Sequence, residues 1–310
     1  MTIEIVHTEH GKGRVRFLKG INLGQVTRLP DKHLVTQATA QVLLEGPDRS
    51  SFLTGDNCAV LPTDTVKNTV QALAKKHEFQ SIEELALILA KHFVQAHPTV
   101  IHVAKVKLVE VQWDRLVTKD ARGQLRPHHH AFVQGGTESR YTYAIARLVG
   151  NGKIDVTLAG GFTDLKVLKT TQSAFVGFLK DNYTTLPEVP DRLVSSSVSA
   201  HWEYSSPTAT AQDAAAVRSA LIEAFAGPSD TGVASPAVQY TLYKMGEAVL
   251  QQVPLVNKIE LYMPNIHNLP VNLAHFGLPN IHPHGELFLP TDEPHGMIRT
   301  TVQRSPNARL

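Results

Sequence analysis

Cysteine is nearly absent from this chain of 310 residues, which contains only Cys58. A single cysteine excludes an internal disulfide, and we expect a buried structural thiol in a reducing compartment. The longest apolar run, residues 85–90, is far shorter than the roughly 20 residues that a membrane-spanning helix needs. The first residues lack the charged and apolar pattern of a signal peptide. We therefore expect a protein that does not span a membrane and is not secreted by the usual route.

An excess of charge of one sign is also lacking. Lys and Arg number 30 against 28 Asp and Glu, which gives a formal net charge of +2. Such a balance predicts no basic surface for nucleic acid. With 42% hydrophobic and 19% charged residues, the composition is typical of a globular protein. The length suits two domains of ordinary size.

The first half of the chain has a clear pattern of elements. Residues 34–44 alternate between apolar and polar side chains, as in a half-buried antiparallel strand. After a turn at 54–57, apolar residues from Val66 to Ala74 follow helical spacing, and Ser81 with Glu84 forms a capping box for a helix that ends near Ala96. An extended stretch follows at 101–113, then a loop with Asp120 and Gly123, and then an alternating run up to 149. The predicted order is strand, strand, helix, helix, strand, strand.

The same order recurs after Gly150-Asn151-Gly152, a sequence that favours a hairpin turn. We place the domain boundary there, which gives domains of residues 1–149 and 150–310. The elements predicted beyond it are a strand from 154, a strand at 194–204, a helix at about 211–225, a helix opened by a Ser235 cap and Pro236, and strands at 258–263 and 297–302. This repeated plan predicts an α+β protein whose antiparallel sheets carry helices on one face.

Several short segments are more specific than this outline requires. They are His10-Gly11-Lys12, Asp56-Asn57-Cys58, residues 62–69, Lys91-His92-Phe93, residues 165–169, residues 175–178, residues 183–186, Asp191-Arg192, Val238-Gln239 and residues 261–267. In order and spacing they resemble the urate oxidase (uricase) family across nearly the whole chain. The resemblance implies tandem tunnelling-fold (T-fold) domains that assemble into an oligomeric barrel. It also implies a homotetramer that converts urate, oxygen and water to 5-hydroxyisourate and hydrogen peroxide in purine catabolism, with no organic or metal cofactor.

Urate is a flat, anionic purine, so its pocket needs a cation, an amide and an apolar face. The resemblance assigns the cation to Arg192, the stacking ring to Phe175, the amide edge to Gln239 with the backbone of Val238, and further contacts to Thr63, Asp64, Leu186 and Asn265. A guanidinium fork suits two acceptors, and an amide both donates and accepts. Taken singly, the same residues also fit ordinary roles, such as an Arg192–Asp191 ion pair or a core phenylalanine.

The resemblance assigns catalysis to Lys12, Thr63 and His267 as a proton relay, with Asn265 and Thr63 at the oxygen and water site. Lysine is a poor base unless burial or neighbours disfavour its charge, so we expect Lys12 to be shielded from water. Thr63 and Asp64 could equally be helix caps. The resemblance further implies inter-subunit active sites, in which Lys12 and the Thr63-Asp64 pair face Phe175, Arg192 and Gln239 of a neighbouring chain.

The sequence departs from the family pattern at four positions. His10 stands where tyrosine is usual, Cys58 where serine or alanine is common, Pro62 where alanine is usual, and Ile266 where a lysine is usual. None removes a proposed catalytic group. Ile266 deletes a nearby charge and Pro62 stiffens the backbone before Thr63, so the proton path and the pH optimum stay open.

Histidine is abundant, with 16 residues that include His128-His129-His130 and the group His282, His284 and His295. Their spacing does not form a ligand set typical of a metal site, so we expect no metal.

The final residues Ala308-Arg309-Leu310 resemble the Ser-Lys-Leu peroxisomal signal, which favours the peroxisome over the alternative, a cytoplasmic location. Two other functions remain open: a non-oxidative tunnelling-fold enzyme acting on purines or pterins, and a non-catalytic purine binder. The first would normally require a metal or a Cys/His/Glu set, and the second would have lost the relay residues.

Overall fold

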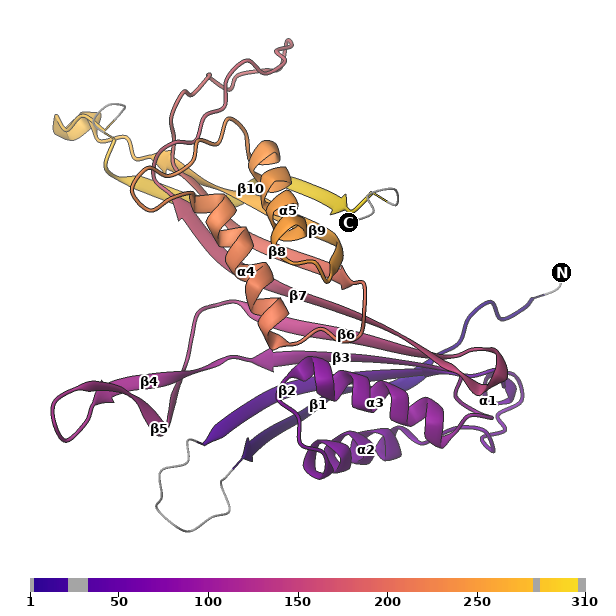
Figure 1. Cartoon of the computed structure of the whole chain (residues 1–310). Coiled ribbons are helices and arrows are strands. Elements are labelled where there is room, and N and C mark those ends of the chain that lie inside the picture. Colours follow the sequence, from indigo (N-terminus) through magenta and orange to yellow (C-terminus); the bar gives the residue numbers. More distant parts are fainter. Residues whose placement is uncertain (1–2, 22–32, 281–284, 306–310) are drawn as a thin grey trace. The chain divides into compact units, whose positions relative to one another are not determined.

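The computed structural model describes residues 3–21, 33–280 and 285–305. Within this part, a main sheet has the strand order β1-β2-β3-β6-β7-β8-β9-β10, and β4 and β5 form a separate hairpin (Figure 1). The strands are β1 His10–Ile21, β2 Leu34–Glu45, β3 Val103–Val111, β4 Trp113–Lys119, β5 Leu125–Gln134, β6 Ser139–Leu148, β7 Ile154–Lys169, β8 Val194–Tyr204, β9 Val256–Pro270 and β10 Phe288–Gln303. The helices are α1 Ser50–Leu53, α2 Thr63–Lys76, α3 Ile82–Ala96, α4 Ala211–Ala226 and α5 Val238–Gln252, with 3-10 turns η1 Gly150–Gly152 and η2 Ala274–Phe276. The predicted α+β class is confirmed.

The chain divides into two compact units. Unit 1 comprises residues 1–161 and 204–214, and unit 2 comprises residues 162–203 and 215–310. The division falls inside β7 instead of at the turn before it, because this strand contributes its first half to unit 1 and its second half to unit 2. The expected domain boundary at residue 150 stays a prediction.

Unit 1 follows the predicted order, but the prediction of a buried Cys58 thiol is wrong, because Cys58 is exposed. In β2 the side chains of Ala38, Ala40, Val42 and Leu44 are buried and alternate with more exposed ones, and β2 pairs antiparallel with both β1 and β3. Helix α3 begins at a capping box, in which Ser81 Oγ accepts the Glu84 N–H at 3.2 Å and Glu84 Oε2 accepts the Gln80 N–H at 2.9 Å. Helices α2 and α3 pack against strands of this unit and close its core.

The sequence predicts one extended stretch over 101–113, followed by a loop with Asp120 and Gly123. The loop is confirmed, since the Gly123 N–H donates to the Asp120 carbonyl at 2.9 Å, but the extended stretch is divided. The strand in fact ends at Val111, and β4 and β5 pair antiparallel around a turn at Asp120. The predicted turn at Gly150-Asn151-Gly152 is confirmed, with φ values of 65° at Asn151 and 72° at Gly152.

In unit 2, helix α5 packs against β9 and β10, and buried Leu242, Met245 and Val249 form its inner face. The sequence predicted that Ser235 caps this helix, and that prediction is wrong. The helix begins at Val238 after Ala237, and Ser235 instead donates its backbone N–H to the Gln172 carbonyl at 2.8 Å. The backbone pairing of Ser235 therefore delays the start of the helix. Among the described helices, none has the length and apolar character that a bilayer crossing requires.

Candidate functional site

In unit 1, Lys12 lies on β1 beside a break in the strand pairing. The register between β1 and β2 shifts between Lys12 and Val15, and Arg14 in this bulge has a φ of 57°. Gly11 precedes Lys12 because the strands are very close there: a Cβ on Gly11 would lie 1.9 Å from the Val42 carbonyl oxygen. Bulges next to functional sites commonly redirect a side chain, and this one flanks Lys12.

Thr63 is the first residue of α2 and is exposed. The Lys12 ammonium donates to Thr63 Oγ1 at 3.4 Å, across 51 residues of sequence. Pro62 occupies the N-cap position with no side-chain capping bond, so the alternative of Thr63 or Asp64 as a cap is wrong. The fold therefore brings together two of the three predicted relay residues.

Asp64 turns toward its own helix. Its carboxylate accepts from Lys67 Nζ at 2.5 Å and from Asn68 Nδ2 at 2.9 Å. The hydrogen bond from Lys67 is the main reason why the pKa of Asp64 lies below its ordinary value. Any contact between Asp64 and substrate would compete with this ion pair.

His10 connects the strand of Lys12 with the segment before Thr63. Its Nε2 lies 3.2 Å from the Leu61 carbonyl oxygen, a partly buried contact. Lys12 itself is only partly covered by the described residues of its unit. The expected shielding of Lys12 from water therefore requires cover from outside this unit.

In unit 2, Arg192 and Phe175 form a cation–aromatic shelf. The guanidinium carbon of Arg192 lies 5.4 Å from the centroid of the Phe175 ring. The ring of Phe178 also stacks on Phe175, with centroids 4.8 Å apart and planes 13° apart. Phe175 is partly exposed, so the alternative of a core phenylalanine is wrong.

Arg192 is a partly buried cation without an anionic partner. Its Nε is buried and has no hydrogen-bond partner, and in the described part of the chain no carboxylate reaches ion-pair distance of it. Asp191 does not pair with it, because that carboxylate accepts from Thr171 Oγ1 at 2.6 Å and from the Ser173 N–H at 3.3 Å. Burial lowers the pKa of Arg192. A desolvated guanidinium of this kind is suited to an anionic ligand.

Helix α5 supplies the predicted amide group. Val238 is buried, with 5% of its surface exposed. Because it is the first residue of the helix, its N–H has no acceptor within the helix. Gln239 follows as an exposed residue in the first turn. The helix start can thus present a backbone N–H and a side-chain amide to one ligand edge.

Asn265 and His267 lie two residues apart on β9, with Asn265 Nδ2 3.5 Å from His267 Nδ1. The neighbouring strand β8 holds this stretch, since Ser195 Oγ donates to the Ile266 carbonyl at 3.1 Å and Ser196 Oγ to the Pro264 carbonyl at 2.6 Å. Because β8 starts two residues after Arg192, these bonds link the Arg192 segment to the strand of Asn265.

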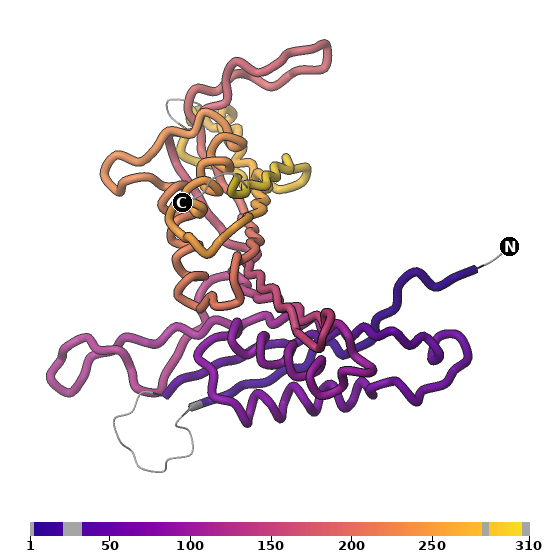
Figure 2. Tube along the Cα trace, turned by 45° about the vertical axis from the view of Figure 1, so that its right-hand side comes forward, coloured from indigo at the N-terminus to yellow at the C-terminus, as the bar shows by residue number. Residues whose placement is uncertain are grey.

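Leu186 lies in the long loop between β7 and β8 and is 52% exposed, so it closes no pocket in a single chain. Figure 2 shows this loop extending from the sheet of its unit.

The sequence interpretation did not include Phe178 among the site residues, although its three-residue spacing from Phe175 is visible in the sequence. Lys12, Thr63 and Asp64 belong to unit 1, and the remaining site residues belong to unit 2.

The histidines that the structure describes do not gather into a ligand set of their own. His128 and His130 pack ring against ring on β5, with centroids 4.6 Å apart, and His295 contacts the Asp292 carbonyl. His282 and His284 lie outside the described residues. The single metal-like group in the described ranges is His7, Glu9 and Glu45. Both of its carboxylates already bind the Lys105 ammonium, which raises the pKa of Lys105 to about 12.

These features define an α+β protein equipped to bind a flat anion. The family model described as "Uricase" matches residues 8–145 and 158–299. A uricase of Danio rerio is 41% identical over 99% of this chain and 97% of the relative, and a uricase-2 isozyme of Glycine max is 38% identical over 95% and 94%. The crystal structure of the Arthrobacter globiformis uricase superposes with a TM-score of 0.84 at 33% identity, covering 100% of this chain and 98% of that one. The chain belongs to the uricase family.

Proposed function

We propose that this chain is a urate oxidase that converts urate, oxygen and water to 5-hydroxyisourate and hydrogen peroxide in purine catabolism, without a cofactor. One observation carries the proposal: Arg192 is a partly buried cation with an unpartnered Nε above the face of Phe175. Desolvating a guanidinium without a partner is unfavourable, and an anionic planar ligand removes that cost. Membership of the uricase family identifies that ligand as urate.

In the proposed complex, the purine stacks on Phe175 and its acceptors face the Arg192 fork. Gln239 and the Val238 N–H bind the amide edge, Leu186 closes the pocket, and Asn265 lies at the oxygen site. This arrangement uses each group for what its chemistry permits. It also explains why Arg192 has no carboxylate partner of its own, since such a partner would compete with the urate anion.

The proposed chemistry is proton transfer followed by direct electron transfer. Lys12 and Thr63, 3.4 Å apart, take a proton from urate, and His267 keeps the relay in line. Deprotonated urate is electron-rich and gives an electron to oxygen. The two radicals then combine to a peroxide, and water displaces hydrogen peroxide from it.

We also propose a homotetramer in which each site is shared by two chains, so that the Lys12 and Thr63 of one chain meet the Arg192 shelf of another. Two features support assembly. Among the described residues, strands β1 and β10 are the outer members of the main sheet, so their outer edges have no paired strand there. The loop between β7 and β8 also exposes Leu179 at 93% and Tyr183 at 91%, which is unfavourable in water unless another chain covers them.

For location we propose the peroxisome, on the sequence Ala308-Arg309-Leu310 alone. These residues lie outside the described part of the chain. A fluorescent protein fused ahead of this chain should collect in peroxisomes, and the same fusion with Leu310→Asp should stay in the cytosol. A diffuse signal from both fusions would support the cytoplasmic alternative.

The direct test of function mixes purified, exhaustively chelated protein with urate in air. We expect loss of urate absorbance, oxygen uptake and peroxide release in equal amounts. Activity that disappears with the chelator and returns with a metal would overturn the cofactor-free reaction. Tight urate binding without oxygen uptake would instead identify a non-catalytic purine binder.

A further inference from the structure

Gln172, in the turn that follows β7, has an unusual backbone conformation. Its φ is +60°, in the left-handed region that is unfavourable for a residue other than glycine. Such a conformation persists where the surrounding structure holds it, and it often occurs close to functional sites. The contacts of Gln172 show what holds it.

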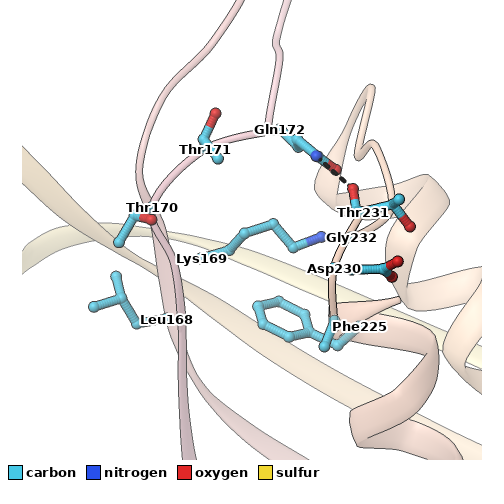
Figure 3. A pocket seen from close by; sticks show the side chains of 10 residues that line it. Leu168, Lys169, Thr170, Thr171, Gln172, Phe225, Asp230, Thr231 and Gly232 are labelled. Carbon is cyan, nitrogen blue, oxygen red and sulfur yellow. Dashed lines mark hydrogen bonds between the residues drawn. The ribbon is translucent and has the colours of Figure 1, made fainter. Parts of the chain in front are cut away.

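Both the side chain and the backbone of Gln172 fasten the segment that leads into α5. Its side-chain Nε2 donates to the Thr231 carbonyl at 2.7 Å, as Figure 3 shows, and its backbone carbonyl accepts the Ser235 N–H at 2.8 Å. The side chain also packs closely on Gly232, where an added Cβ would lie 2.8 Å from Gln172 Oε1. Residues 231–235 are thus held at both ends.

The residues that follow Gln172 are hydrogen-bonded to the segment before α5 and to Arg192. The Ala174 N–H donates to the Ser235 carbonyl at 2.8 Å, and the Arg192 N–H donates to the Ser173 carbonyl at 2.8 Å. Phe175 follows directly and forms a β-bridge with Val189. Residues 172–175 therefore lie between the Arg192 segment on one side and the approach to Val238 on the other.

We propose that Gln172 is a positioning residue for substrate: it fixes the start of α5 relative to Arg192 and Phe175, and so sets the spacing between the amide group and the cation of the urate site. The proposal rests on the proposed function, because it concerns the same site. Gln172 does not touch the substrate itself. It acts through the 231–235 segment, and its loss lets Val238 and Gln239 move away from the plane defined by Phe175.

Two substitutions of Gln172 distinguish a role in positioning the substrate from a role in stabilising the fold. Gln172→Gly removes the side chain but favours the positive φ and keeps the carbonyl that binds Ser235. Gln172→Asn also tolerates this conformation, yet its amide is one methylene too short for the Thr231 carbonyl. Both should raise KM for urate and the Kd for xanthine, a purine-dione, by roughly tenfold, with kcat within about threefold, because misplaced binding groups weaken recognition. The matched control is Thr170→Ala, an exposed neighbour in the same turn, which should change nothing.

The outcomes are distinguishable. A purely structural role would lower Tm and the active fraction in both variants while KM and the xanthine Kd stayed at wild-type values, and this result would overturn the inference. Equal xanthine affinity in Gln172→Gly and wild type would overturn it as well. Failure of the wild-type chain to bind xanthine or consume urate would instead refute the proposed function.

Discussion

The two groups of candidate site residues differ in how firmly the chain holds them. In unit 1 the Lys12–Thr63 pair rests on one 3.4 Å contact between a partly covered lysine and an exposed threonine. In unit 2 the Arg192 shelf is held by the hydrogen bond that the Arg192 N–H donates to the Ser173 carbonyl and by the stacked rings of Phe175 and Phe178. A single chain therefore holds its binding groups in place without substrate, whereas its proton-transfer pair, Lys12 and Thr63, stays accessible to water.

This difference has a physical consequence. Groups that are fixed before binding lose little entropy when substrate arrives, which favours affinity. A lysine that must accept a proton benefits from exclusion of water, which the Lys12 pair does not obtain from its own unit. Binding and chemistry should therefore respond differently to mutation and to dissociation of the assembly.

The largest expected effect is the loss of kcat when the Lys12–Thr63 pair is removed. Lys12→Met and Thr63→Ala should each lower kcat by roughly 10²–10⁴, because general-base groups act mainly in the transition state. The xanthine Kd should stay nearly unchanged, as measured by titration calorimetry alongside single-turnover oxidation. The double variant should be little worse than the poorer single one, since residues that act as one unit give non-additive losses.

Near wild-type rates in Lys12→Met, or fully additive losses in the double variant, would show that the proton leaves by another route. His267 would then be the next residue to test.

The second effect tests the shelf. Arg192→Lys keeps the charge but not the planar fork, and it should weaken xanthine and urate alike by about 2 kcal/mol or more. Unlike the relay variants, it should lose affinity and rate together. Unchanged xanthine affinity would remove Arg192 from the pocket.

A smaller effect should follow from loosening the support of Thr63. His10→Phe keeps the ring but removes the nitrogen that contacts the Leu61 carbonyl. Because Leu61 precedes Thr63 by two residues, we expect kcat to fall severalfold while the xanthine Kd stays constant. His10→Tyr, which restores a donor, is the control. A change in Kd without a change in kcat would contradict this role for His10.

The smallest expected effect is on the free energy of unfolding, through the ion pairs of Lys105 in unit 1. Glu45 and Glu9 raise the pKa of Lys105 to about 12, from an ordinary 10.5. A raised folded pKa contributes stability that is fully present below the unfolded pKa and is lost as pH rises through about 12. Lys105→Gln should therefore lower the unfolding free energy by about 1 kcal/mol at neutral pH, with a shrinking difference toward pH 12. A difference that grew with pH in urea denaturation would contradict this.

Much of the fold could be predicted because it depends on local patterns. The alternation in β2, the capping box of α3 and the Gly150-Asn151-Gly152 turn are set by neighbouring residues, and all three were confirmed. The start of α5 was misplaced because Ser235 forms backbone bonds with Gln172, more than 60 residues earlier. A distant pairing of that kind leaves no mark on local sequence.

The site residues were named from a resemblance, and their surroundings could not be read from the sequence. The pairing of Asp191 with Thr171 and Ser173, which leaves Arg192 without a carboxylate, depends on a turn 20 residues away. The ion pair of Asp64 with Lys67 could have been predicted from the sequence, because residues three apart in a helix lie on the same face.

In the proposed assembly, the Lys12–Thr63 pair of one chain meets the Arg192 shelf of another chain. The most direct test of this arrangement mixes two inactive variants, Lys12→Met and Arg192→Ala, unfolds and refolds them together, and measures urate oxidation. Random pairing leaves about one site in four with both wild-type halves, so the mixture should recover roughly a quarter of wild-type activity while each variant refolded alone stays inactive. A mixed assembly of normal size with no recovered activity would contradict the shared site.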